Sequence, residues 1–248
     1  MQAKRRRYMD LFYYVAVTML VVVFGRGVVA QDWRTASLEA AGLAPDAATT
    51  REAIVQVYAA RTWGWKGSFG VHTWIAVKPA EADSYKVYEV IGWKLRWSGS
   101  ALSVSERAPD GHWFGNAPEL LAQKRGADAA DLIPRIEQAV ASYPYAREYA
   151  VWPGPNSNTF IAWISRAVPE LKLDLPPTAI GKDFLGDRIL GPAPSGAGFQ
   201  FSLGGVLALT ASGVEGLEVN VLGLTFGLDP FSPALKLPLI GRIGAARF

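Results

Sequence analysis

Residues 51–80, REAIVQVYAARTWGWKGSFGVHTWIAVKPA, decide which fold the chain is expected to adopt. Residues 54–61 and 71–78 are rich in β-branched and aromatic side chains, and the segment between them contains three glycines. This pattern is typical of two antiparallel strands joined by a turn. The alternative is a helix that begins at a capping box formed by Thr49 and Glu52. We favour the hairpin and interpret the rest of the domain around it.

Further strand-like segments follow the hairpin. Residues 85–97, YKVYEVIGWKLRW, have the composition of a third strand, which would extend the same sheet. Residues 109–126 are rich in turn-forming residues and predict an extended loop. Residues 149–152 are short and apolar, and they predict one more short strand.

Two helices are predicted in the second half of the chain. The segment ADLIPRIEQAVASY, residues 130–143, has apolar residues at helical spacing, and Asp131 is its predicted cap. The second helix follows the segment VWPGPN and is expected to end at Pro169. Its apolar residues fall on one face and are Phe160, Ile161, Ile164 and Val168.

The chain becomes apolar and rich in glycine between residues 199 and 228. Glu215 and Glu218 lie in the middle of this stretch, and a carboxylate at the centre of a bilayer costs roughly 2 to 3 kcal/mol even on lenient scales. Two apolar strands joined by a turn at residues 212–216 are therefore predicted in place of a membrane span. Their apolar character outside a core is explained if they face a membrane surface. We expect a single α+β domain over residues 51–248, after a linker at residues 31–50.

The net charge of +3 arises from the first thirty residues. Five basic residues stand there against one acidic residue, Asp10, so this segment carries +4 and the remaining chain is close to −1; the basic residues are Lys4, Arg5, Arg6, Arg7 and Arg26. A domain that binds nucleic acid would need a basic face of its own. No nucleic-acid partner is expected.

The apolar run LFYYVAVTMLVVVFG, residues 11–25, follows the basic cluster. A basic flank before an apolar run of this length is typical of a signal peptide or of an uncleaved signal anchor over residues 1–30. Val28 and Ala30 provide small residues for cleavage after Ala30, which would release the protein into the periplasm. We favour the anchor, a single transmembrane helix in a bacterial inner membrane with a periplasmic domain and the lipid bilayer as a partner.

The residue inventory limits the chemistry. The chain has no cysteine, which excludes disulfides, thiolate catalysis and cysteine-bound zinc. It has no phosphate loop, dinucleotide fingerprint or helical pair of metal-binding histidines, so neither a cofactor nor a metal is expected. Of the two histidines, His112 lies in the turn-rich segment APDGHWFGN and is predicted to be exposed in a loop. Lys182 and Asp183 are predicted to be a solvated pair of charges.

His72 and Ser157 form the candidate catalytic pair. In a strand over residues 71–78, His72 shares one face with Trp74, and it is either a histidine satisfied inside the sheet or a general base. Ser157 lies at the start of the second helix, where unpaired N–H groups and the helix dipole stabilise an anion. The alternative is that Ser157 or Asn156 is only a helix cap, which contributes about 1 kcal/mol.

Five segments together resemble a bacterial group, the domain-of-unknown-function 3750 family. They are SFGVHTWIAVKP, YEVIGW, YPYAREYAVWPGPNSNTFIAWISRAVPEL, LPPTAIGKDF and EGLEVNVLGLTFGLDP, and the resemblance extends from about residue 55 to residue 244. This resemblance implies no particular activity.

More distantly, the order of strands, histidine and helix is similar to that of circularly permuted papain-like proteins of the NlpC type. In those proteins a histidine precedes the nucleophile, which is a cysteine in a segment like NCNxF. The segment NSNTF would place Ser157 at the position of the cysteine and His72 at that of the histidine. The resemblance implies an antiparallel sheet packed against helices, as in the permuted papain-like fold.

The replacement of a cysteine by a serine changes what the site needs. A cysteine thiol has a pKa of about 8.5 that can fall further, whereas a serine must lose its proton to a well-oriented base during attack. Glu89, on the predicted third strand, is the candidate that orients the imidazole, and Tyr88 and Asn156 are weaker candidates. The predicted substrate-binding residues are Asn156, Asn158, Thr159 and Trp74.

These features leave several functions open. The leading hypothesis is a membrane-associated envelope protein with a papain-like cleft, which either hydrolyses or transfers an amide or ester or only binds such a group. The alternatives are a structural or scaffolding protein in which the Asn-Ser-Asn-Thr segment is only a cap, and a lipid-interacting protein that uses residues 199–228. The partner is an envelope substrate or protein. Six of the nine tryptophans lie in residues 63–113, where some of them could line a groove for a glycan or an acyl chain.

Overall fold

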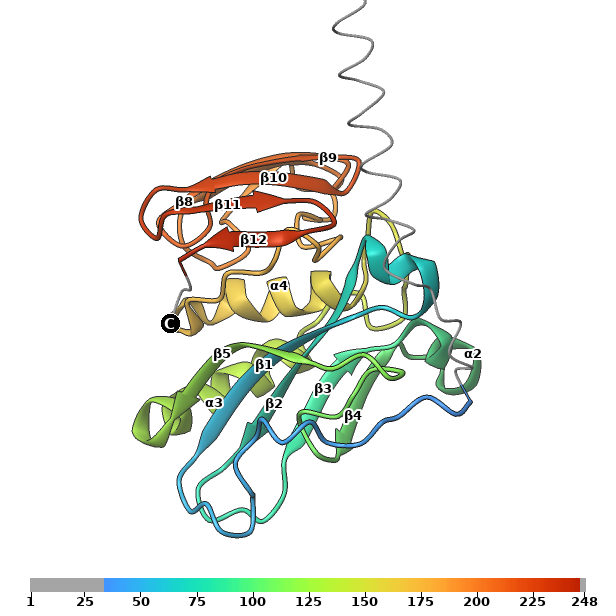
Figure 1. The fold of residues 1–248 in the computed structure, drawn as a ribbon, viewed down its shortest axis with the longest axis vertical. Helices are drawn as coiled ribbons and strands as arrows, with labels where there is room; N and C mark the ends of the chain where they lie inside the picture. Colours follow the sequence, from blue (N-terminus) through green and yellow to red (C-terminus); the bar gives the residue numbers. More distant parts are fainter. Residues whose placement is uncertain (1–33, 246–248) are drawn as a thin grey trace, which may run out of the picture.

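The computed structural model describes residues 34–245 as two antiparallel sheets with a helix, α4, between them (Figure 1). The fold is α+β, as predicted. The first sheet has five strands in the order β4-β3-β2-β1-β5. Its strands are β1 (Ile54–Arg61), β2 (Val71–Lys78), β3 (Lys86–Val90), β4 (Leu102–Glu106) and β5 (Glu119–Arg125).

The predicted hairpin is confirmed by the pairing of β1 with β2. The two strands are antiparallel over their whole length, with Tyr58 opposite Trp74, and a short 3-10 helix, η1 (Gly64–Ser68), lies in the connection. The alternative helix at Thr49 and Glu52 is wrong. All eight residues of β2 are buried, because both faces of this central strand are covered.

The predicted third strand is correct only in its first half. β3 ends at Val90, and the chain continues as a 3-10 turn, η2 (Gly92–Lys94), and a short helix, α2 (Leu95–Ser98). The backbone at Gly92 passes so close to the Tyr149 ring that a Cβ atom there would lie 2.4 Å from it. The chain leaves the sheet at this point. Trp97 is 85% exposed, so its aromatic character does not reflect a strand packed in the core.

Three predictions in the middle of the chain are wrong, the first of them because pairing with β1 outweighs local sequence preference. Part of the predicted loop at residues 109–126 is strand β5, which pairs with β1 along its other edge. The following helix, α3 (Gly126–Ala141), begins before the predicted cap, so Asp131 lies inside it. Residues 149–152, predicted to be a strand, form bends outside both sheets.

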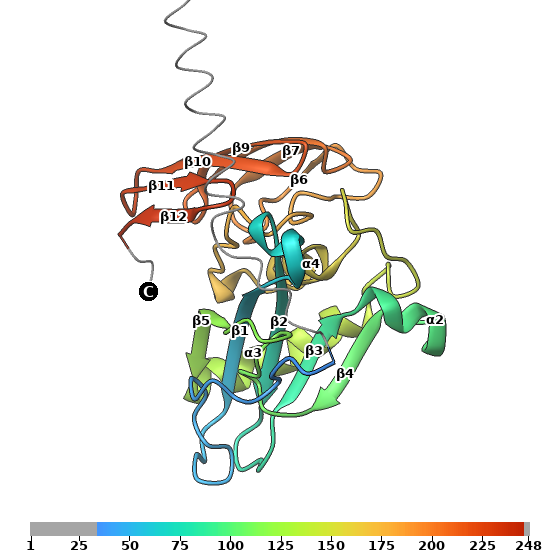
Figure 2. The same ribbon diagram turned by 45° about the vertical axis from the view of Figure 1, so that its right-hand side comes forward.

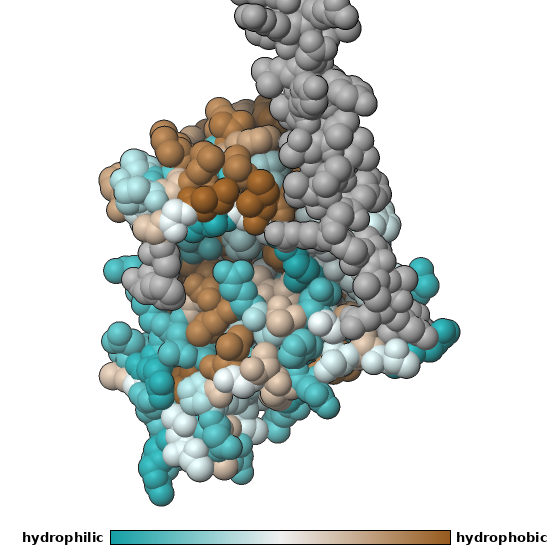
Figure 3. Space-filling model, in the orientation of Figure 1, coloured by the Kyte–Doolittle hydropathy of each residue, from teal (hydrophilic) through white to brown (hydrophobic). Residues whose placement is uncertain are grey.

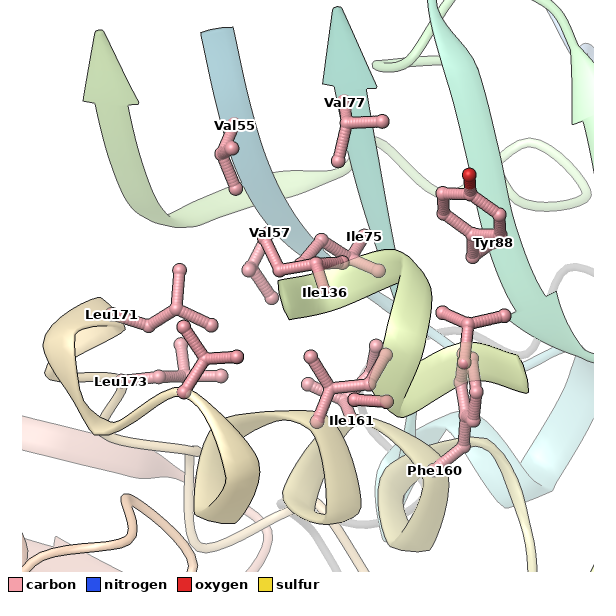
Figure 4. Packing of buried hydrophobic residues seen from close by; sticks show 14 of the residues in the cluster. Val55, Val57, Ile75, Val77, Tyr88, Ile136, Phe160, Ile161, Leu171 and Leu173 are labelled. Carbon is pink, nitrogen blue, oxygen red and sulfur yellow. The ribbon is translucent and has the colours of Figure 1, made fainter. Parts of the chain in front are cut away.

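Helices α3 and α4 (Ser157–Ala167) cover one face of the first sheet. In Figure 4, Phe160 and Ile161 of α4 point towards the strands that carry Val57 and Ile75, and all four side chains are at most 1% exposed. α4 ends just before Val168 and Pro169, as predicted, and a 3-10 turn, η3 (Pro169–Leu171), follows.

The opposite face of the first sheet has its own apolar cluster, which includes Tyr58 and Trp74. The amino-terminal segment and the loop after β4 cover this cluster. The Asp110 carboxylate accepts hydrogen bonds from the backbone N–H groups of Leu43 and Ala44, at 2.6 and 3.2 Å. Trp74 donates to the Pro109 carbonyl oxygen at 2.6 Å.

The second sheet is a meander of seven strands in the order β12-β11-β10-β9-β8-β7-β6 (Figures 1 and 2). The predicted turn is confirmed, because β8 and β9 pair up to Ser212 opposite Gly216. The prediction of only two strands was too low, because neighbouring hairpins continue on both sides. The strands are β6 (Leu190–Gly191), β7 (Phe199–Leu203), β8 (Leu207–Ser212), β9 (Gly216–Val221), β10 (Leu224–Asp229), β11 (Ala234–Leu237) and β12 (Gly241–Gly244).

The inner face of the second sheet is polar and charged, and it covers the segment that carries Lys182 and Asp183. The Lys182 ammonium lies 2.7 Å from Glu218 on β9, and Lys236 on β11 lies 2.7 Å from the other oxygen of the same carboxylate. Asp183 accepts hydrogen bonds from Gln200 and Asn220, at 2.6 and 2.7 Å. The predicted solvated pair is therefore wrong, since Lys182 and Asp183 are 1% and 2% exposed.

No helix within residues 34–245 combines the length and apolar character that a membrane crossing requires. The predicted signal anchor, with its apolar run at residues 11–25, lies outside the described residues.

Candidate functional site

A cavity of about 690 Å³ is lined by both His72 and Ser157, although they are 85 positions apart in the sequence. It lies where β2 begins, beside the amino-terminal end of α4 and the loops around η1 and η2. Asn156 and Asn158 also line it. The rest of its wall is largely aromatic and includes Trp63, Trp65, Phe69, Trp93, Trp113, Phe114 and Tyr149.

Asn156, and not Ser157, caps helix α4. The Asn156 side-chain oxygen accepts hydrogen bonds from the backbone N–H groups of Asn158 and Thr159, at 2.9 and 3.1 Å. The Thr159 hydroxyl in turn accepts from the Asn156 backbone N–H at 3.1 Å, which completes a capping box. Asn156 also donates to the Val151 and Ile180 carbonyl oxygens, so the cap ties the helix start to two loops.

Ser157 is the first residue of α4, one position after the cap. Its carbonyl oxygen accepts a hydrogen bond from the Thr73 hydroxyl on β2, at 3.2 Å. Within residues 34–245, no hydrogen bond joins the Ser157 hydroxyl or its backbone N–H to another protein group. The residue is 4% exposed and lines the cavity, so its hydroxyl is available to a bound molecule.

His72 is held from behind by Glu89. The imidazole Nε2 lies 3.0 Å from one Glu89 oxygen, and Arg107 donates to the other oxygen at 3.2 Å. Glu89 faces the same side of the sheet as His72, because it lies directly opposite Trp74 in the β2–β3 pairing. Since Nε2 is engaged by Glu89, Nδ1 is the ring nitrogen left for a reacting group.

Two residues of this arrangement were missed by sequence reasoning. Trp113 stacks on the His72 ring, with ring centroids 3.7 Å apart and planes 15° apart. Arg107 lies over the Trp74 ring at 5.7 Å and reaches Glu89. Both come from the loop after β4, whose position depends on long-range contacts. In the sequence, the only local sign that these two residues belong to the site is that a basic and an aromatic residue stand among turn-forming residues.

The predicted substrate-binding residues have structural partners. Asn158 donates to the Val71 and Ile180 carbonyl oxygens and accepts from the Thr73 hydroxyl, which fixes α4 against β2. Thr159 belongs to the capping box, and Trp74 is fully buried behind His72. Only Asn156 and Asn158 of this group line the cavity. Their role in binding a substrate stays a prediction.

The second histidine lies apart from this cavity. His112 is only half-buried, and its Nδ1 lies 2.8 Å from the Glu39 carbonyl oxygen. This contact fastens the amino-terminal segment to the loop after β4, so His112 is less exposed than predicted.

The pKa of Glu89 is below its ordinary value of 4.5. Burial raises this pKa, but the hydrogen bond and charge of His72, together with Arg107, outweigh burial. A carboxylate with a lowered folded-state pKa stabilises the protein above its unfolded-state pKa, and this stabilisation is lost as the pH falls through the folded-state pKa.

We therefore expect the difference in free energy of unfolding between the protein and a Glu89→Gln variant to be largest at neutral pH. It should shrink as the pH falls below 4.5, because protonated Glu89 then resembles the glutamine. Urea denaturation of both proteins across this pH range measures the difference. A constant difference would show that the charge of Glu89 does not contribute to stability.

The fold and site define a class: an α+β protein in which a helix-start serine and a carboxylate-supported histidine share one aromatic cavity. Residues 52–184 match the family described as "Protein of unknown function (DUF3750)". The match covers more than half of the chain, and the chain belongs to this family. The matched residues include both sides of the candidate site, whereas the seven-stranded sheet lies after them. Neither the curated proteins nor the solved structures include a match to this chain.

Proposed function

We propose that the cavity is the active site of a hydrolase or transferase that acts on an amide or ester. One observation carries this proposal: Ser157 and His72 line the same cavity. The Ser157 hydroxyl has no hydrogen-bond partner among the described residues, and His72 Nε2 is held by the buried Glu89 carboxylate. A serine nucleophile requires a base, and the base requires a group that orients it. Ser157, His72 and Glu89 have the side-chain types for these three roles.

In the proposed mechanism, the Ser157 oxygen attacks the substrate carbonyl while its proton passes to His72 Nδ1. Glu89 stabilises the imidazolium that forms, and Arg107 keeps Glu89 in place. The Ser157 backbone N–H and the positive end of the α4 dipole would stabilise the oxyanion. His72 then gives the proton to the leaving group as the amide or ester bond breaks, which leaves the acyl group on Ser157. Water or an acceptor, deprotonated by His72, attacks this acyl group and restores the Ser157 hydroxyl. No hydrogen bond joins the two side chains within the described residues, and such bonds are often long until substrate binds.

The papain-like resemblance supports the same assignment. A permuted papain-like domain has its histidine on a strand before a helix that begins with the nucleophile, and β2 and α4 have this order here. The aromatic wall of the cavity is suited to the apolar part of a substrate, such as an acyl chain, or to the face of a sugar ring. With the predicted anchor, the substrate would be a component of the cell envelope on the periplasmic side.

A fluorophosphonate or β-lactone probe tests this proposal. We expect the purified full-length protein to be labelled, and peptide mapping should locate the label on Ser157. Absence of labelling would refute the catalytic role. The protein would then either bind an amide or ester without cleaving it or be a scaffolding protein in which the Asn-Ser-Asn-Thr segment is only a helix cap. Retention of an ester analogue by the unlabelled protein would distinguish these two.

A further inference from the structure

The outer face of the seven-stranded sheet is apolar over its whole width. Side chains at alternate positions of the strands point outward and are 36% to 57% exposed. In Figure 3 these residues form the brown surface in the upper part of the molecule. This outer apolar face consists of Phe199, Leu203, Leu207, Leu209, Leu217, Val219, Val221, Leu224, Phe226, Leu228, Leu235 and Ile243.

No charged side chain interrupts this face. Residues 199–244 contain five charged residues, of which Glu215, Glu218, Asp229 and Lys236 are at most 3% exposed. The fifth, Arg242, lies opposite the buried Lys236 and pairs with Asp174 and Asp229. A sheet with one face in water ordinarily buries its apolar side and exposes its polar side. Here the order is reversed, and the apolar patch exceeds the scattered apolar residues expected on a soluble surface.

The reversed orientation is fixed by contacts on the inner face. Glu218 lies between Lys182 and Lys236, and Asn220, on the same side of β9, donates to Asp183. A shift of one residue in register would move these groups outward and leave Lys182 buried without its partner. The outer apolar face is therefore a specified surface of the folded protein.

We propose that the outer apolar face lies on the surface of a lipid bilayer, with its side chains at the boundary of headgroups and acyl chains. The sequence supports this occupant, because the apolar run with its basic flank ends at Gly25, nine residues before Arg34. Nine residues span at most about 30 Å, so the predicted anchor would keep Arg34, and with it the folded domain, near a bilayer. Because this surface exposes no charged group, docking on a bilayer does not remove water from a charge and avoids that energetic cost.

Tryptophans at the rim of the face favour the same occupant. Trp152 is 46% exposed and donates to the Leu222 carbonyl oxygen in the β9–β10 turn. Trp65, in η1, is 64% exposed. η1 lies near the β11–β12 turn of the second sheet, because the Arg61 side chain, three residues before η1, donates to the Leu239 carbonyl oxygen in that turn. Tryptophan is enriched where proteins meet the membrane–water interface. This inference goes beyond the proposed function and does not depend on it.

A single cysteine with an environment-sensitive fluorophore tests the proposal on the full-length protein, because the chain has no cysteine of its own. The positions are Leu209→Cys and Val219→Cys on the outer apolar face. The matched control is Val104→Cys on β4, which is 53% exposed on the other sheet. Each variant, labelled with nitrobenzoxadiazole, is reconstituted into vesicles of phosphatidylcholine and phosphatidylglycerol, with and without nitroxide-labelled lipid.

We expect a blue shift of emission and strong quenching by nitroxide lipid at positions 209 and 219, and neither effect at position 104. Equal quenching at all three positions, or none at 209 and 219, would overturn the proposal. A blue shift without nitroxide quenching, together with a dimer in size-exclusion chromatography, would also overturn it and would assign the face to a second copy of the chain. Circular dichroism confirms that each variant keeps the fold.

Discussion

Replacing Ser157 with alanine is expected to abolish labelling by the fluorophosphonate probe and to lower ester hydrolysis by about 10⁴-fold or more. The reason is that, among the described residues of the first turn of α4, Thr159 is the other one with a hydroxyl, and it is held in the capping box, so the covalent step loses its nucleophile. The free energy of unfolding should change by no more than about 0.5 kcal/mol, because within the described chain the Ser157 hydroxyl makes no hydrogen bond. Labelling kinetics and urea denaturation measure the two effects.

The matched control is Asn156→Ala, which should mainly affect stability. This variant leaves two backbone N–H groups of α4 without their acceptor and removes the Asn156 donor from the Val151 and Ile180 carbonyl oxygens, of which Ile180 keeps the bond from Asn158. We expect a loss of about 2 kcal/mol, the upper end of measured helix caps. If Ser157→Ala retains labelling and instead loses about 1 kcal/mol of stability, Ser157 is part of the cap and the catalytic proposal is wrong.

Replacing Glu218 with glutamine is expected to destabilise the protein by about 3–5 kcal/mol. Burial raises the pKa of Glu218, but Lys182 and Lys236 outweigh burial and hold it below its ordinary value. Burial lowers the pKa of Lys182, but Glu218 together with Asp183 and Asp174 raises it above its ordinary value. The variant places a neutral amide between two buried ammonium groups: Lys236 keeps its ion pair with Asp174, but Lys182 loses its ion pair with Glu218, and breaking a buried pair from one side is costly. Urea denaturation measures the loss.

The control for this prediction is Glu81→Gln, which breaks an ion pair with Arg51 at the surface. Both side chains are largely exposed, so water and salt screen the pair, and little change in stability is expected. A Glu218→Gln variant as stable as this control would show that the buried charges do not hold the second sheet in place.

Local patterns were sufficient for the elements whose neighbours in space are also neighbours in sequence. The β1–β2 hairpin followed from β-branched residues around a glycine-rich turn. The end of α4 followed from Pro169, and the turn between β8 and β9 from glycines around Glu215. The assignment of His72 and Ser157 to one site was predicted from their motifs and from a resemblance. The two residues are 85 positions apart, so their spacing in the sequence gives no argument for it.

Long-range contacts decided the features that local patterns did not predict. β5 is a strand because it pairs with the free edge of β1. Trp113 reaches His72, and Arg107 reaches Glu89, because their loop folds over the far face of the first sheet. Asn156, and not Ser157, became the cap because its amide also bonds to the Val151 and Ile180 carbonyl oxygens.

The histidine and serine of the candidate site were combined with the help of the papain-like resemblance, whereas the α+β class, the central hairpin and the helix with a polar start were predicted from local patterns. These features depend on alternation, turn residues and helix ends, which act over a few neighbouring residues. The burial of Lys182 and Asp183 depends instead on contacts across the folded chain, and the same contacts fix the outward orientation of the apolar side of the second sheet. Alternation shows that a strand has two different faces, but which face is covered depends on the charges that the rest of the chain brings against it.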